Sequence, residues 1–344
     1  MAPMDRRLRV WAWVTRRQTQ GLLRGEAEVL ALQARGRRIP DNALTNFILG
    51  KVAPGTEVTD RTIPGPAGQL PVRVYQPVRA ASGGRPLILN FHGGGFVFGA
   101  PRLSDWRCSN VAVTVGAVVV SVDYRLAPRH RFPAAVDDSY AALLWASENA
   151  AALGAGGPIG VMGESAGGNL SAVTCLLARD RGGPAIAHQV LLYPGVDLTS
   201  TPPAKANTPF ISGPEMKAYR DYYLGDADPS DPRASPLLAT DHSGLPPALI
   251  QVGEHDPLRD GGVRYAAALR AAGVPVRLTE YVGMPHGYLN FPGLCRLAPQ
   301  ALREICAEQT EALVTRPSVA RTSPAARPSQ PQPPPARQPR PSTR

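Results

Sequence analysis

The fold of this chain is decided by the stretch PIGVMGESAG, which occupies residues 158–167. Its first five residues form a short apolar run of the kind found in buried parallel strands. Its last five fit the pattern G-x-S-x-G, in which a serine sits on a strained turn between a strand and a helix. Gly163 and Gly167 suit this turn because a Cβ on either side of the serine would clash with neighbouring backbone. Apolar side chains at helical spacing follow in 166–179, so the stretch predicts a strand, a turn that exposes the Ser165 hydroxyl, and a helix.

A glycine-rich loop, His92-Gly93-Gly94-Gly95, lies upstream of this turn. It follows the apolar run 87–91, so the glycines open the loop after a predicted strand. Such a loop can aim backbone N–H groups at a developing oxyanion, since no side chain stands in the way. A flexible connection is the alternative, and the serine turn downstream favours the oxyanion hole.

One of the six histidines is the candidate for a general base. His286 lies in the loop Met284-Pro285-His286-Gly287, directly after the apolar, strand-like run 276–282. The other five are better explained by their surroundings in the glycine loop, beside the acid candidate, or in structural and polar segments: His92, His130, His188, His242 and His255.

Three acids, Glu254, Asp256 and Asp260, could orient this histidine, and motif order alone does not choose among them. Residues 248–252 form a predicted buried strand, which places Asp256 in the loop at its carboxyl end, where the serine turn also emerges. Asp260 falls at the start of the next predicted helix, where a carboxylate is favoured for structural reasons. The order serine, acid, histidine is that of the α/β-hydrolase triad.

The chain resembles the hormone-sensitive lipase family of α/β-hydrolases, which includes bacterial carboxylesterases and arylacetamide deacetylases. The resemblance covers about 86–313 and rests on fragments in family order: HGGGF (92–96), DYRLAP (123–128), GESAGG (163–168), HDPLRD (255–260) and HGY (286–288). It implies that Ser165 is the nucleophile, Asp256 the acid and His286 the base. It also implies an oxyanion hole made by the N–H groups of Gly94, Gly95 and Ala166.

Two positions depart from the family pattern. Glu164 precedes the serine where aspartate is common, and Asp260-Gly261-Gly262 stands where a second acidic residue is frequent. Neither change is expected to touch the reacting atoms, but the first can alter how the serine turn is braced.

Alternating strands and helices predict an α/β fold, with a mostly parallel central sheet flanked by helices and covered by a helical cap. The predicted strands lie near 70–75, 86–91, 117–122, 158–162, 188–193, 247–252 and 276–282. The predicted helices lie near 18–33, 134–150, 166–180, 213–223, 261–272 and 297–313.

The expected domain organisation has three parts. Residues 1–55 form N-terminal cap helices, 56–314 form the catalytic domain with a second cap segment at 195–235, and 315–344 form a disordered tail rich in proline and arginine. The net charge of +10 comes from the two ends of the chain, because 40–314 are nearly neutral. This distribution argues against nucleic acid as a partner, and a basic membrane-surface helix at the N-terminus remains the rival to a cap helix.

The four cysteines, Cys108, Cys175, Cys295 and Cys306, show no paired or metal-binding spacing. No export signal or apolar run of membrane-spanning length is evident, so a reducing cytoplasm is the expected compartment and stable membrane insertion is not expected. The oligomeric state stays open, with a dimer as one option.

The expected activity is hydrolysis of short- to medium-chain carboxylic esters through an acyl-enzyme on Ser165. This chemistry requires no metal or organic cofactor, and its partner is a small acyl ester. An acyltransferase, amidase or lactonase would use the same residues. A small-molecule receptor is the alternative from a different class, and the presence of serine, acid and histidine together argues against it.

Overall fold

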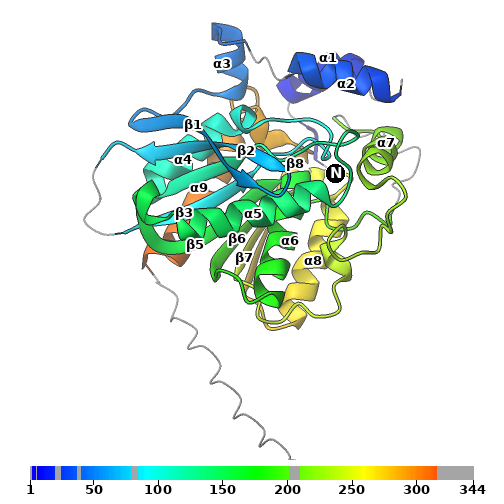
Figure 1. Cartoon of the computed structure of the whole chain (residues 1–344). Coiled ribbons are helices and arrows are strands. Elements are labelled where there is room, and N and C mark those ends of the chain that lie inside the picture. Colours follow the sequence, from blue (N-terminus) through cyan, green and yellow to red (C-terminus); the bar gives the residue numbers. More distant parts are fainter. Residues whose placement is uncertain are drawn as a thin grey trace, which may run out of the picture.

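An eight-stranded sheet runs through the centre of the molecule (Figure 1). The computed structural model describes residues 2–4, 6–19, 25–36, 40–79, 84–200 and 210–315. The strands are β1 Thr56–Gly65, β2 Gly68–Pro77, β3 Arg85–Phe91, β4 Val118–Val122, β5 Ala155–Glu164, β6 Ile186–Leu192, β7 Ala248–His255 and β8 Val276–Pro285. The α-helices of the described residues are α1 Arg6–Thr19, α2 Glu26–Gly36, α3 Ala43–Leu49, α4 Asp105–Val115, α5 Ala134–Glu148, α6 Ala166–Asp180, α7 Gly213–Leu224, α8 Arg259–Ala271 and α9 Ala298–Thr310.

The strands follow the spatial order β1-β2-β4-β3-β5-β6-β7-β8. β1 and β2 pair antiparallel, as do β2 and β4, while every pair from β4 through β3 to β8 is parallel. The carboxyl ends of these parallel strands therefore meet at one edge of the sheet, where open α/β sheets carry their binding sites. The predicted α/β-hydrolase fold is confirmed.

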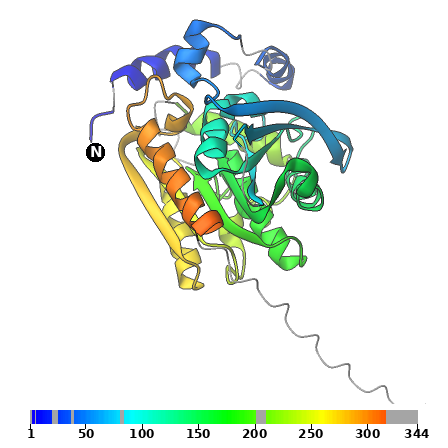
Figure 2. The ribbon, with the colours of Figure 1, turned by 90° about the vertical axis from the view of Figure 1, so that its left-hand side faces the viewer.

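Helices cover both faces of this sheet, and each face has its own hydrophobic core. Helices α5, α6 and α8 contribute to one core, and α4 and α9 to the other. Figure 2 shows α9 along one face, with α5 on the far side of the sheet. Side chains alternate along the strands, so Val118 and Val120 enter the first core while Val119 enters the second. Strands buried on both faces explain why β3 and β4 appear in the sequence as continuous apolar runs.

The sequence did not predict β1, α3 or α4. Most of β1 is exposed or half-buried because it is the edge strand of a hairpin with β2, so it lacks an apolar run. In α4 the polar side chains of Arg107 and Ser109 are buried among apolar ones, which hides the helical pattern. Prediction of a single helix over 18–33 was wrong. The structure has α1 and α2 instead, and Gly25, with a φ of +107°, breaks the helical backbone before α2.

The N-terminal helices lie together above the sheet (Figure 2). Two hydrogen bonds tie α2 to the body, because Nε2 of Gln33 donates to the carbonyl oxygens of Val97 (2.6 Å) and Ala127 (2.7 Å). Trp11 of α1 packs edge-on against Phe291, with ring centroids 5.9 Å apart. These contacts hold the N-terminal helices beside the loops at the carboxyl edge of the sheet.

Two further predictions concern the tail and the membrane. The predicted disordered tail lies, apart from Thr315, outside the described residues. Among the helices that the structure describes, none has both the length and the apolar character needed to cross a bilayer.

Candidate active site

Ser165 occupies the sharp turn between β5 and α6, as the sequence predicted. Its backbone has φ 54° and ψ −116°, a conformation that is strained for a residue other than glycine. A Cβ on Gly163 would lie 2.1 Å from the carbonyl oxygen of Gly167, and one on Gly167 would lie 2.0 Å from that of Phe91. Glycine is therefore required on both sides of the serine, because no side chain fits there.

The Ser165 hydroxyl meets an imidazole that is itself held by a carboxylate. Nε2 of His286 lies 2.9 Å from Oγ of Ser165, and Nδ1 of the same ring lies 2.8 Å from Oδ2 of Asp256. The other carboxylate oxygen of Asp256 accepts a hydrogen bond from the backbone N–H of Leu258 at 2.8 Å. The three side chains come from the turns after β5, β7 and β8, which the parallel strand order brings together.

The other two acids near Asp256 point elsewhere. The Glu254 carboxylate accepts hydrogen bonds from the backbone N–H groups of Ala2 (3.0 Å) and Gly283 (2.8 Å). Asp260 lies in the first turn of α8 and pairs with Arg259 on the surface. Of the three acids, Asp256, which its place after a predicted strand favoured, is the one within hydrogen-bond distance of His286.

The environment of His286 raises its basicity. Burial lowers the pKa of the imidazole, but the charge of Asp256, its hydrogen bond and the charge of Glu164 together raise the pKa by more, so it lies above its ordinary value. The ring of Tyr193 packs edge-on against that of His286, with centroids 5.1 Å apart. The histidine is therefore fixed in orientation by a carboxylate on one side and an aromatic ring on the other.

The glycine loop lies beside Ser165 in the same cavity. The cavity has a volume of about 200 Å³, and its wall includes Gly94, Gly95, Ser165, Ala166 and His286. Gly94 has a φ of +120° and Gly95 a φ of +61°, values that favour glycine. Within the described residues, the backbone N–H groups of Gly94, Gly95 and Ala166 donate to no other protein atom. These three amides are therefore free to bind an oxygen atom in the cavity.

Apolar side chains from several elements complete the wall. α7 supplies Met216 and Tyr219, and the loops at the carboxyl edge supply Phe96, Leu198 and Leu258. A Cβ on Gly95 would lie 2.3 Å from Cδ1 of Tyr219, so α7 packs directly on the glycine loop. Phe96 and Leu258 belong to the quoted fragments HGGGF and HDPLRD, although the sequence analysis assigned them no role. Met216, Tyr219 and Leu198 come from segments without a motif, so the sequence did not single them out.

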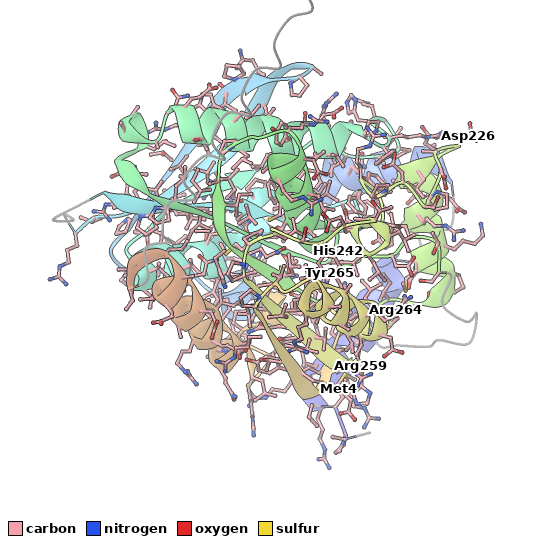
Figure 3. The ribbon with its side chains drawn as sticks, turned by 90° about the horizontal axis from the view of Figure 1, so that it is seen from below. Met4, Asp226, His242, Arg259, Arg264 and Tyr265 are labelled. Atoms are coloured by element: carbon pink, nitrogen blue, oxygen red, sulfur yellow. The ribbon has the colours of Figure 1, made fainter. Side chains whose placement is uncertain are left out.

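The five remaining histidines lie outside the serine–imidazole–carboxylate arrangement. His242 packs edge-on against Tyr265 of α8, with ring centroids 5.5 Å apart (Figure 3). His188 is buried in β6, where burial lowers its pKa to about 4. The others are the buried His92 of the glycine loop, the exposed His130, and His255, whose Nε2 lies 2.7 Å from the carbonyl oxygen of Ala2.

Comparison with known proteins identifies the family of the chain. Residues 88–290 match a protein family described as having the alpha/beta hydrolase fold. The chain belongs to this family. Its resemblance to the hormone-sensitive lipase group is thereby confirmed, and this α/β-hydrolase is an enzyme.

Two relatives from Mycobacterium tuberculosis are similar to this α/β-hydrolase over most of its length. Carboxylic ester hydrolase LipN is 47% identical to this chain in a region that covers 68% of this chain and 65% of LipN. This chain therefore spans about two thirds of the length of LipN. Esterase LipI is 42% identical over 73% of this chain and 80% of its own. Among solved structures, a hyperthermophilic esterase from the archaeon Pyrobaculum calidifontis is similar to this chain with a TM-score of 0.74 and 37% sequence identity. The matched region covers 90% of this chain and 99% of the esterase chain.

Proposed function

We propose that this α/β-hydrolase hydrolyses carboxylic esters of short to medium acyl length through an acyl-enzyme on Ser165. The observation that carries this proposal is the 2.9 Å contact between Oγ of Ser165 and Nε2 of His286 inside the glycine-lined cavity. A hydroxyl in contact with an oriented imidazole is the arrangement that nucleophilic catalysis of acyl transfer requires. The names of LipN and LipI, as a carboxylic ester hydrolase and an esterase, support the same reaction class.

In this proposal each side chain has one role in the reaction. Ser165 attacks the ester carbonyl while His286 takes the hydroxyl proton at Nε2 and then gives it to the leaving alcohol. Asp256 holds the imidazole in the required tautomer and stabilises the imidazolium form. Water then attacks the acyl-enzyme with help from the same histidine, and the carboxylic acid leaves.

The tetrahedral intermediate carries a negative charge on the former carbonyl oxygen. The free amides of Gly94, Gly95 and Ala166 line the cavity and are the proposed donors to this oxygen. Removal of one such donor typically lowers kcat by about 10²–10³-fold. The proposed oxyanion hole thus depends on the two glycines with positive φ.

The cap and the compartment belong to the same proposal. Residues 1–55 and 195–235 form a two-part cap over the catalytic domain 56–314, and the packing of Tyr219 on Gly95 and the hydrogen bonds of Gln33 support this division.

The four cysteines are free thiols and all are buried, which is compatible with a reducing cytoplasm.

We expect kcat/KM to rise with pH through the pKa of His286, because only the neutral imidazole can accept the serine proton. Since Asp256 raises that pKa, activity should be lost as the pH falls through a value above the ordinary 6.5 of histidine. The measurement is kcat/KM for a soluble ester over a range from about pH 5 to 9. A flat profile, or an inflection well below the ordinary value, would contradict a histidine base held by a carboxylate.

We expect the highest kcat/KM for esters with short to medium acyl chains. The described residues enclose a cavity of only about 200 Å³, with Phe96, Met216 and Tyr219 in its wall. The test is a series of acyl esters of one alcohol, from acetate to long chains, with kcat/KM measured for each. Faster turnover of an emulsified long-chain triglyceride than of a butyrate ester would show that the acyl preference is wrong.

A further inference from the structure

A buried acid lies next to the serine. Glu164 directly precedes Ser165, lines the same cavity, and has a side chain only 2% exposed. A carboxylate at such a site is stable only if it is paired and hydrogen-bonded. Its partners therefore indicate why the charge is kept beside the reacting atoms.

The first partners lie on α4 and in the glycine loop. Nη2 of Arg107 lies 3.2 Å from Oε1 of Glu164, and the arginine side chain is equally buried. The backbone N–H of Gly93 donates to the same oxygen at 3.4 Å, and a Cβ on Gly93 would lie 3.0 Å from Cγ of Glu164. Glu164 thus contacts the start of the loop that carries Gly94 and Gly95.

The second set of partners lies beside His286. The hydroxyl of Tyr193 donates to Oε2 of Glu164 at 2.9 Å, while the ring of the same tyrosine packs against the imidazole. Tyr193 adopts a φ of 38°, a strained value for a tyrosine, at the carboxyl end of β6. The side chain of Asn290, four residues after His286, also lowers the pKa of the Glu164 carboxyl.

We propose that Glu164 is a positioning residue whose buried carboxylate holds the glycine loop, the serine turn and the histidine loop in one fixed arrangement. It acts through Gly93, through its own peptide bond to Ser165, and through Tyr193, whose ring packs against His286. This inference rests on the proposed function, since it assigns Glu164 a role in aligning Ser165, His286 and the oxyanion hole. Misplacement of reacting groups by about 1 Å can lower a rate on the order of 10²-fold.

The charge of Glu164 also reaches the imidazole. Burial raises the pKa of the Glu164 carboxyl, but Arg107, Tyr193 and Asn290 lower it by more, so the group is ionised at neutral pH. This negative charge adds to that of Asp256 in raising the pKa of His286. The titratable and charged groups that interact with Glu164 come from α4, the glycine loop, the segment after β4, the end of β6 and the histidine loop: Arg107, Cys108, His92, Tyr124, Tyr193 and His286.

The decisive variant is Glu164→Gln, which removes the charge and keeps the shape. We expect kcat to fall on the order of 10²-fold while KM changes little, because alignment and not substrate binding is lost. The acid limb of the profile, which is the fall of kcat/KM at low pH, should move to lower pH because a negative charge near His286 is removed. Glu164→Gln leaves Arg107 buried without a counter-charge, so Arg107→Gln/Glu164→Gln is measured beside it as the neutral pair.

Tyr193→Phe separates alignment from charge. It removes only the hydroxyl that binds Glu164 and leaves both the charge and the ring, so kcat should fall while the acid limb stays in place. Glu304→Gln is the matched control. Its carboxylate also accepts from a tyrosine, Tyr281, and pairs with an arginine, Arg277. It lies on α9, and its hydrogen-bond and ion-pair partners among the described residues all come from β7 and β8. This control should keep the wild-type kcat and pH profile.

The outcomes distinguish this inference from the proposed function. Glu164 is only structural, and the inference is wrong, if Ser165→Ala is inactive while Glu164→Gln is folded and keeps the wild-type kcat and pH profile. Where Glu164→Gln does not fold, the neutral pair Arg107→Gln/Glu164→Gln is judged by the same criterion. If Ser165→Ala stays active, the proposed function itself fails. A lowered kcat with a shifted acid limb, together with an unshifted limb in Tyr193→Phe, would support the positioning role.

Discussion

Ser165→Ala should lower ester hydrolysis by a factor on the order of 10⁴ or more, because it deletes the attacking oxygen and leaves the rest of the site in place. The fold should be unchanged, since the variant removes one hydroxyl from a turn that is fixed by Gly163 and Gly167. The measurement is kcat/KM for a short-chain ester, with thermal unfolding as the control for folding. The residual rate reports what the glycine loop and substrate binding contribute without the nucleophile.

Labelling by a fluorophosphonate probe provides an independent readout of the same variant. The wild-type chain should be labelled at Ser165 and the variant should not, because the probe reacts with an activated serine. A variant that kept about a tenth of the wild-type activity and remained labelled would show that another residue is the nucleophile. A wild-type chain that was folded but neither labelled nor active would favour a small-molecule receptor.

Asp256→Asn should lower kcat by about 10³–10⁴-fold. The carboxylate now accepts a hydrogen bond from Nδ1 of His286 at 2.8 Å, which leaves Nε2 free to accept the Ser165 proton. An asparagine can present its NH₂ group to Nδ1 instead, which favours the wrong tautomer and removes the charge that stabilises the imidazolium. The measurement is kcat under saturating substrate, beside Ser165→Ala.

Glu254→Gln and Asp260→Asn are the matched controls for this variant. Glu254 binds the backbone N–H groups of Ala2 and Gly283, and Asp260 pairs with Arg259 on the surface, so both variants should keep most of the wild-type kcat. Asp260→Asn should affect the stability of α8 more than the chemistry, because a carboxylate in the first turn favours the helix. If either control abolished turnover while Asp256→Asn remained active, the acid would be misassigned.

The local chemistry of this chain could be predicted from short stretches of sequence. The serine turn requires glycine on both sides of Ser165, because a Cβ at either position would lie 2.0–2.1 Å from a backbone oxygen. The apolar runs of β3, β4 and β5 identified buried parallel strands because both of their faces are covered. Such features depend on residues close in sequence, and a pattern can therefore reveal them.

Features whose stability comes from distant partners were not predictable in this way. β1 is a strand because it pairs with β2, and its own exposed side chains carry little pattern. In α4, Arg107 is buried because Glu164, far away in the sequence, supplies its counter-charge. Neither interaction leaves a local signal in the sequence.

The same distinction applies to the site. The sequence by itself determined the identity of Ser165 and His286 as candidates, because each lies in a glycine-flanked loop after an apolar strand. The sequence already favoured Asp256 as the acid, because Asp256 follows a predicted strand, and the tertiary structure places it against His286. Only the tertiary structure decided that the Glu164 carboxylate contacts Gly93 and Tyr193, which lie in two other loops. The physical reason is that hydrogen bonds act over about 3 Å in space, and separation along the chain does not report that distance.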